Sequence, residues 1–204
     1  MRRSLPLLLP VYLCVTLVGV TAAAHPAKPA AAPADVTTVA RPIRARWERR
    51  PDKPVRVFIA HADTGSGWRP EMVDAVWATF RRWSTQGVPV RFVRAKSPAV
   101  ADVVVEWVDD LPGNCIGKTW RRDHGDEIDA ARITLALHDH RGRALTLDMQ
   151  RGAALHEVGH LLGLAHVGHR DSIMYPQVWV TDVSDGDRTA LKDLYRHRPD
   201  VLAD

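Results

Sequence analysis

The chain has 204 residues, which leaves room for one domain of ordinary size once a targeting segment is set aside. Hydrophobic residues make up 46% of it, enough for a packed core and too many for a disordered chain. The net charge is only +4, and Arg2 and Arg3 supply half of that excess, so the charge gives no reason to propose a nucleic-acid partner.

Residues 1–24 have the pattern of an export signal. Two arginines precede the apolar stretch LPLLLPVYLCVTLVGV, and small residues follow it, with cleavage predicted after Ala24. We therefore expect a secreted protein, extracellular or in the cell envelope. The apolar stretch is just long enough for a membrane anchor, although Pro6 and Pro10 weaken a spanning helix. Membrane attachment is expected only if the signal is not cleaved.

Residues 25–46 are rich in Pro, Ala and Arg and have little to bury. This composition favours a linker or a short pro-segment. A single domain is then expected over residues 47–204. Once the signal is removed, Cys115 is the one remaining cysteine, which excludes an internal disulfide and favours a small buried side chain.

The first regular elements of this domain are predicted at residues 54–60 and 68–86. The run PVRVFIA alternates and is rich in β-branched residues, which favours a strand. In the second segment apolar residues recur at helical spacing and form one broad face, so we interpret its aromatic residues as core. That face consists of Met72, Val73, Val76, Trp77, Phe80 and Trp83.

Four further strands are predicted after this helix. Each is a run of mainly apolar or β-branched residues bounded by polar segments, and the run Val103 to Val105 suggests a strand buried on both faces. The polar, acidic segment 123–130 is predicted to be the loop between the last two strands. The four predicted strands are residues 88–94, 101–108, 116–122 and 131–137.

Two helices complete the predicted elements. Apolar spacing predicts helices over residues 146–164 and 183–197, with Thr146 and Ser184 as their N-caps. The order of one strand, one helix, several strands and two more helices favours an α/β or α+β fold. In such a fold the sheet is backed by two long helices.

The segment HEVGHLLGLAH, residues 156–166, has the spacing of a metal site. His156 and His160 are four residues apart on the predicted helix, so both imidazoles lie on one face and can point at one ion. Zinc accepts imidazole nitrogen and prefers tetrahedral geometry. His166 follows six residues later, where a straight helix would direct it elsewhere. Gly163 can end the helix in a left-handed turn and bring His166 back to the metal.

Three protein ligands leave the fourth zinc position open, as catalytic sites do and closed structural sites do not. Glu157 follows His156 directly and would lie beside that position. There it can take a proton from a metal-activated water and pass it to a leaving amine. The motif therefore predicts zinc at His156, His160 and His166, and amide-bond hydrolysis with Glu157 as general base and acid.

Two other functions compete with this one. The first is a non-catalytic zinc module that only holds a peptide in the same cleft. Glu157 argues against it, because binding alone does not need that carboxylate. The second is a membrane-anchored peptidase that keeps its N-terminal segment.

The motif H-E-x-x-H by itself also occurs by accident, whereas the longer pattern H-E-x-x-H-x-x-G-x-x-H is far more specific.

HEVGHLLGLAH followed by SIMYP resembles the metzincin zinc peptidases, and among them the matrixins. The resemblance implies an α+β fold with a twisted mixed sheet of about five strands backed by two long helices, an active-site helix, a Met-turn and a C-terminal helix. It implies that Met174 forms the Met-turn beneath the zinc, and that Tyr175 and Pro176 contribute to the wall of the substrate pocket. It covers about residues 47–197.

By the same resemblance, residues 116–122 would be the edge strand that pairs with substrate, and the partners would be proteins or peptides in extended conformation. We expect a monomer. The cysteine switch of the family has no counterpart before the domain, because the only cysteine there is Cys14. Two further metal sites are weaker predictions: a second metal at His124, His138 and His140, and calcium at Asp123, Asp126, Glu127 and Asp129, for which a solvated turn is the default.

Overall fold

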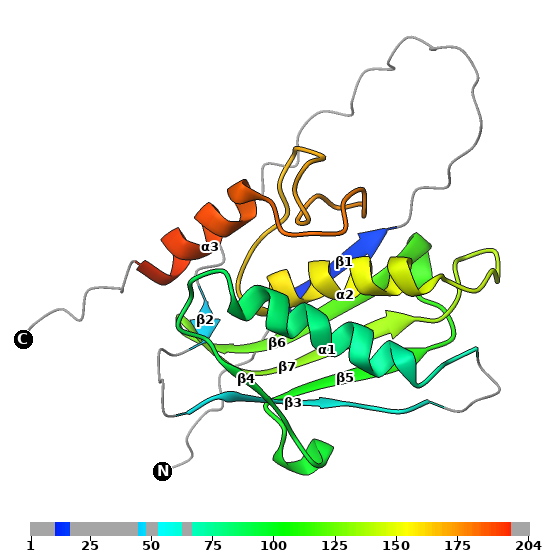
Figure 1. Ribbon diagram of the computed structural model, residues 1–204, viewed down its shortest axis with the longest axis horizontal. Coiled ribbons are helices and arrows are strands. Elements are labelled where there is room, and N and C mark those ends of the chain that lie inside the picture. Colours follow the sequence, from blue (N-terminus) through cyan, green and yellow to red (C-terminus); the bar gives the residue numbers. More distant parts are fainter. Residues whose placement is uncertain (1–10, 17–44, 48–52, 63–66, 197–204) are drawn as a thin grey trace, which may run out of the picture.

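The computed structural model describes residues 11–16, 45–47, 53–62 and 67–196. Most of the predicted linker, and residues 1–10 and 17–24 of the predicted signal, lie outside these ranges. Within them the chain forms one mixed sheet with three helices (Figure 1). The strands are β1 (Val11–Thr16), β2 (Arg46–Trp47), β3 (Val55–Ile59), β4 (Phe92–Arg94), β5 (Val103–Val108), β6 (Cys115–His124) and β7 (Glu127–Ala136); the helices are α1 (Glu71–Ser84), α2 (Leu147–Leu161) and α3 (Asp185–Arg196).

The sheet has the strand order β1-β6-β7-β5-β3-β4, and the short β2 pairs with β7 outside this sequence. Strands β3, β4, β5 and β7 run parallel, whereas β6 is antiparallel to β7 and β1 is antiparallel to β6. Helices α1 and α2 lie side by side against the same face (Figure 1). The predicted α+β fold is confirmed, with β1 and β2 added to the five expected strands.

The apolar stripe of α1 is core, as its spacing predicted. Met72, Val76, Phe80 and Trp83 are all buried, and the last two are completely inaccessible. Val76, Phe80 and Trp83 share one core cluster with the inward-facing residues of β3, β4 and β5, whereas Met72 packs with Trp68 and Leu137 in a second cluster. The indole nitrogen of Trp83 also donates a hydrogen bond to Leu155 O of α2 at 2.8 Å, so α1 holds α2 by a directed contact as well as by packing.

Two predicted boundaries differ from the structure. The strand expected at 88–94 is ordered as a strand only from Phe92, and Pro89 has no N–H to donate to a ladder. The acidic loop expected at 123–130 is wrong. Strands β6 and β7 continue through most of it as a hairpin that turns at Gly125, with Asp123 opposite Ile128. Pairing between the strands outweighs the polarity of the side chains, most of which are exposed.

Strand β1 lies along the outer edge of β6, with Tyr12 opposite Trp120 and Cys14 opposite Lys118. In the full chain Cys115 is disulfide-bonded. It is half-buried and not the small, buried, unpaired side chain that we expected for a chain without its first 24 residues. No helix within the described ranges has the length and apolar character needed to cross a membrane.

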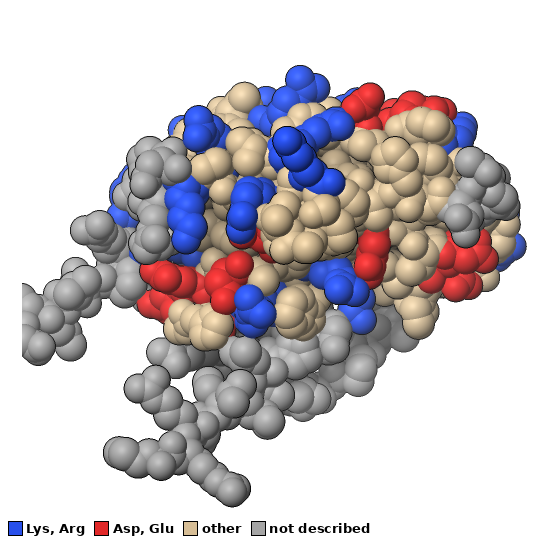
Figure 2. Space-filling view, turned by 90° about the horizontal axis from the view of Figure 1, so that it is seen from below, with Lys and Arg blue, Asp and Glu red and all other residues tan. Residues whose placement is uncertain are grey.

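The surface seen from below carries basic and acidic side chains next to one another (Figure 2). Several exposed bases of the described residues pair with acids, which neutralises charge locally. Arg56 lies 2.7 Å from Asp102, and Arg122 lies 2.8 Å from Asp129. Exposed pairs of this kind contribute at most about 1 kcal/mol each, so the fold depends on the core and not on these contacts.

Candidate metal centre

Helix α2 carries the central motif and is almost completely enclosed. It begins at the predicted cap, where the Thr146 hydroxyl accepts a hydrogen bond from Met149 N at 3.3 Å. Every residue from Gly152 to Leu161 is buried. A helix buried on all sides needs small residues where neighbours approach closely. A Cβ at Gly159 would collide with Met174, and one at Gly152 would collide with Val178.

The end of α2 is built on Gly163, whose φ is +103°. Gly163 N donates to His160 O at 3.0 Å, and Leu164 N donates to Gly159 O at 3.0 Å, so the last turn is closed by backbone bonds. A Cβ at Gly163 would lie 2.5 Å from Ala45 O, which excludes larger residues. The predicted left-handed turn is confirmed, and it reverses the chain toward His166.

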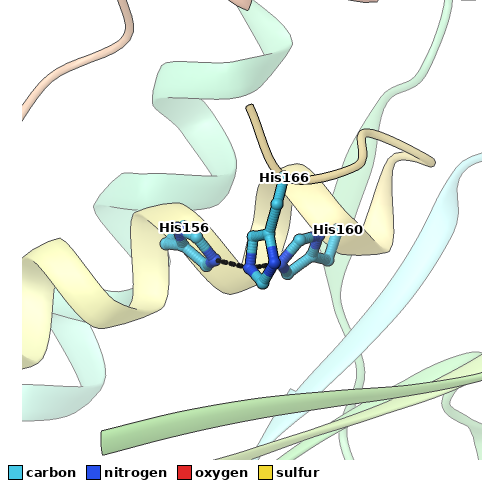
Figure 3. A group of neighbouring side chains, drawn as sticks. All are labelled: His156, His160 and His166. Carbon is cyan, nitrogen blue, oxygen red and sulfur yellow. Dashed lines mark hydrogen bonds between the residues drawn. The ribbon is translucent and has the colours of Figure 1, made fainter. Parts of the chain in front are cut away.

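The three imidazoles converge on one point. His156 and His160 project from α2, and His166 reaches them from the segment after the helix (Figure 3). The Nε2 atoms of His156 and His160 each lie 3.1 Å from Nε2 of His166. Tetrahedral zinc with bonds of about 2.0–2.1 Å separates its ligand nitrogens by roughly 3.3 Å. The spacing of these nitrogens therefore fits one zinc ion.

Hydrogen bonds at Nδ1 determine the tautomer of His156 and of His160. His156 Nδ1 lies 2.6 Å from Ile173 O, and His160 Nδ1 lies 2.8 Å from Leu164 O. A carbonyl oxygen only accepts, so both Nδ1 atoms carry the proton and both Nε2 atoms offer a lone pair. Burial lowers the pKa of His156 to about 3, the pKa of His160 well below its usual range, and the pKa of His166 as well. Neutral imidazoles are the form that binds metal.

Glu157 is completely buried next to His156, and strand β6 holds its carboxylate. The Thr119 hydroxyl lies 2.6 Å from Glu157 Oε2. Gly117 leaves room for the side chain, since a Cβ there would lie 2.8 Å from Glu157 Oε1. Sequence reasoning missed both residues of β6. The alternation of the strand predicts that they share a face, but nothing local indicates which helix residue they meet.

The segment with Met174 lies beneath this helix. Met174 is buried against Gly159, in the turn of α2 between His156 and His160. Its carbonyl oxygen accepts from Val167 N at 3.1 Å, which links it to the residue after His166. Tyr175 and Pro176 follow and are half-buried. Their part in a pocket wall stays a prediction.

Asp187 of α3 fastens this segment and was not predicted from the sequence. Its carboxylate accepts from Ile173 N at 3.0 Å and from the Ser172 hydroxyl, so it supports the residues just before Met174. It also accepts from Ser184 N at 2.9 Å, while Ser184 Oγ accepts from Asp187 N at 3.1 Å. Ser184 is thus the N-cap of α3, as predicted. Asp187 completes a capping box in which Asp replaces the usual Glu.

The carbonyl groups at the end of α2 are also satisfied from outside the helix. The buried Arg121 side chain donates to His160 O at 2.9 Å and pairs with Asp123 at 2.9 Å. Trp47 donates to Leu161 O at 3.0 Å, and the Tyr195 hydroxyl donates to Leu162 O at 3.2 Å. A cation and two neutral donors therefore replace water at the buried C-terminus of the helix.

The other predicted metal residues are not brought together. His138 lies 2.7 Å from Asp109, and His124 lies 3.0 Å from Asp129 near the opposite end of β7. Among the described residues the histidine triad is the one group of three or more metal-ligating side chains with converging ligand atoms. The second metal and the calcium site gain no support from this arrangement.

Comparison with known proteins gives a consistent result. A family model described as matrixin matches residues 58–196. Metalloendoproteinase 4-MMP of Arabidopsis thaliana is 25% identical over 148 residues, which cover 66% of this chain and 42% of that protein. Metalloendoproteinase 1-MMP of the same plant is 27% identical over 61% of this chain and 38% of its own length. Matrix metalloproteinase-26 of Homo sapiens is 33% identical over 37% of this chain and 28% of its own. The chain spans less than half the length of these relatives.

Proposed function

Because the chain belongs to the matrixin family, whose members are zinc metallopeptidases, we propose that it is a secreted zinc endopeptidase. The observation that carries this proposal is the convergence of three imidazoles, in which the Nε2 atoms of His156 and His160 each lie 3.1 Å from Nε2 of His166. The residue after His156 on the same helix carries a buried carboxylate. His156, His160 and His166 would hold the ion. Three ligands of this kind are typical of a catalytic site and not of a closed structural one.

The chemistry divides between the metal and Glu157. Zinc, when bound, supplies a Lewis acid that makes water nucleophilic near neutral pH and polarises a carbonyl group. The Glu157 carboxylate accepts the proton of the attacking water and then delivers it to the amine of the leaving fragment. The hydrogen bonds from His156 Nδ1 and His160 Nδ1 keep both rings oriented throughout.

We place the substrate along the outer edge of β6, as an extended peptide in antiparallel register. The pairing of Val11–Thr16 with that edge supports this, because a strand of the same chain already uses the hydrogen-bonding groups that a substrate would need. Tyr175 and Pro176 are proposed for the wall of the pocket that receives a substrate side chain. A monomeric protein, exported by residues 1–24 and active as residues 47–204, completes the proposal.

The test compares residues 25–204 with the same protein carrying Glu157→Ala. Zinc content and cleavage of a mixed peptide library are measured for both. We expect one zinc per chain in each, because Glu157 is not a ligand. Cleavage by the variant should fall by at least about a hundredfold, the usual contribution of a general base.

A zinc-binding module without catalysis predicts a different outcome. Both proteins would then hold zinc and neither would cleave, even after residues 25–44 are removed, a deletion that keeps Ala45 and β2 in place. A parent that holds no zinc would contradict both functions. The membrane-anchored alternative is tested separately, by the N-terminal residue of the exported protein: His25 indicates cleavage, and Met1 indicates a retained segment.

A further inference from the structure

We propose that Thr119 is a positioning residue for Glu157: its hydroxyl holds the carboxylate in the orientation that proton transfer requires. The proposal rests on the function proposed above and adds a residue outside the zinc motif to it. Thr119 lies 38 residues before Glu157, in the middle of β6, and is completely buried.

The inward face of β6 is matched to this part of α2. Gly117, Thr119 and Arg121 alternate along it, and all three are buried. Gly117 gives the Glu157 side chain its space, Thr119 gives it a donor, and Arg121 directs its guanidinium to His160 O and Asp123. Of these three side chains, Thr119 is therefore the one that donates a hydrogen bond to the Glu157 carboxylate.

The hydrogen bond from Thr119 is of the strong kind. Its length of 2.6 Å is in the range of charge-assisted hydroxyl–carboxylate bonds. Thr119 Oγ1 also lies 3.1 Å from Glu157 O, but a hydroxyl has one proton, and the shorter contact with the carboxylate takes precedence. Loss of such a bond leaves a buried polar group unsatisfied, which costs free energy.

The effect on orientation follows from the torsions of Glu157. Rotation about the last bond of a glutamate is only weakly restricted, so packing alone does not fix the plane of the carboxylate. A donor on Oε2 fixes that plane and with it the direction of Oε1. Since proton transfer is sensitive to misplacement by about 1 Å, loss of the donor should lower the rate of the chemical step and leave substrate binding intact.

The experiment uses Thr119→Val, which keeps the shape of the side chain and removes its hydroxyl. The variant is made in the form of the protein that cleaves peptides without the substitution, either the full chain or residues 25–204. We expect kcat to fall by about 10- to 100-fold. KM should change by less than about twofold, because binding in the ground state is unaffected. Zinc content should stay the same. Thr119→Ser, which restores the hydroxyl, should recover most of the loss, and Thr119→Ala should reproduce it if Val is not tolerated at this position.

Thr134→Val is the matched control. Thr134 is a strand threonine on β7 whose hydroxyl lies 3.2 Å from the Glu106 carboxylate, away from the metal centre. The Thr134→Val substitution removes a hydroxyl–carboxylate hydrogen bond of the same kind from the same sheet. Because that bond does not involve Glu157, kcat should be unchanged. A fall in kcat equal to that of Thr119→Val would mean that any such loss disturbs the enzyme, and would overturn the proposal.

A second readout does not depend on catalysis. In the metal-free protein, Thr119→Val should lower the urea midpoint more in the parent than in Glu157→Ala, because the alanine variant has no carboxylate to which the Thr119 hydroxyl can donate. Equal shifts, or an active parent whose kcat is unchanged by Thr119→Val, would overturn the inference and leave the proposed function standing. A parent that never cleaves overturns both.

Discussion

At the scale of single residues, Asp187 has an unusual concentration of contacts for one carboxylate. It accepts hydrogen bonds from Ser172 Oγ, Ile173 N, Ser184 N and Ser184 Oγ, and it is almost completely buried. Two of these donors belong to the segment before Met174 and two to the start of α3. One side chain thus connects the segment under the metal centre to the last helix.

Asp187→Asn is expected to lower the free energy of unfolding by about 3 kcal/mol, because the amide nitrogen would place its own hydrogens against backbone and hydroxyl donors. Urea denaturation measures this. The control is Asp185→Asn in the same helical turn, where the side chain is 92% exposed and pairs with Arg188. It should lower stability by less than about 1 kcal/mol. Equal effects would show that the network around Asp187 has no special role.

At the scale of elements, the end of α2 determines where His166 lies. The helix stops at a glycine with φ +103°, and the following residues return along the helix so that Val167 N reaches Met174 O at 3.1 Å. The backbone conformation and the contact with Ala45 O both require glycine at position 163. The position of the proposed third ligand therefore depends on a residue that is not itself a proposed ligand.

Gly163→Ala should destabilise the protein by more than the roughly 1–2 kcal/mol of left-handed strain, and should weaken zinc binding about tenfold as His166 moves. Gly142→Ala separates the two effects. Gly142 has φ +72°, and a Cβ added there would meet no atom within 4 Å, so this variant carries the strain without the collision. Competition with a fluorescent zinc chelator measures the affinity. A loss of affinity in both variants would contradict the argument.

At the scale of the whole molecule, the first residues and the proposed substrate compete for one edge. Val11–Thr16 extends the sheet beyond β6, and Cys115 at the start of β6 is disulfide-bonded. A protein that has lost residues 1–24, with the Cys115 disulfide opened as well, would present the β6 edge to solvent. Removal of the N-terminal segment would then expose the proposed substrate site, in addition to any role of that segment in export.

The full chain should accordingly cleave an extended peptide roughly tenfold more slowly than residues 25–204, since a tethered strand acts at a high effective concentration. Steady-state kinetics on both forms tests this, with the difference expected in KM. Zinc content must be the same in the two preparations. Equal KM values would mean that β1 does not obstruct the edge that substrate uses.

Local signals in the sequence predicted most of the fold and the centre of the site. The caps at Thr146 and Ser184, the turn at Gly163 and the spacing of the histidines depend on neighbours within a few residues, and periodicity reports such neighbours well. The contact of Thr119 with Glu157 depends on the register between a strand and a helix, which no local pattern encodes. The burial of Arg121 could not be predicted from the sequence either, because a basic residue in a polar strand normally faces water.

The division of the histidines between a helix and a returning segment has a consequence for how the protein folds. His156 and His160 belong to one turn of α2, so even a partly folded chain offers that pair. His166 precedes a segment that is held by the contact of Val167 N with Met174 O and by Asp187 of α3, so we expect it to join the pair only when that segment and α3 are in place. The proposed ion would therefore bind weakly until α3 has formed, and tight zinc binding would report that α3 has docked.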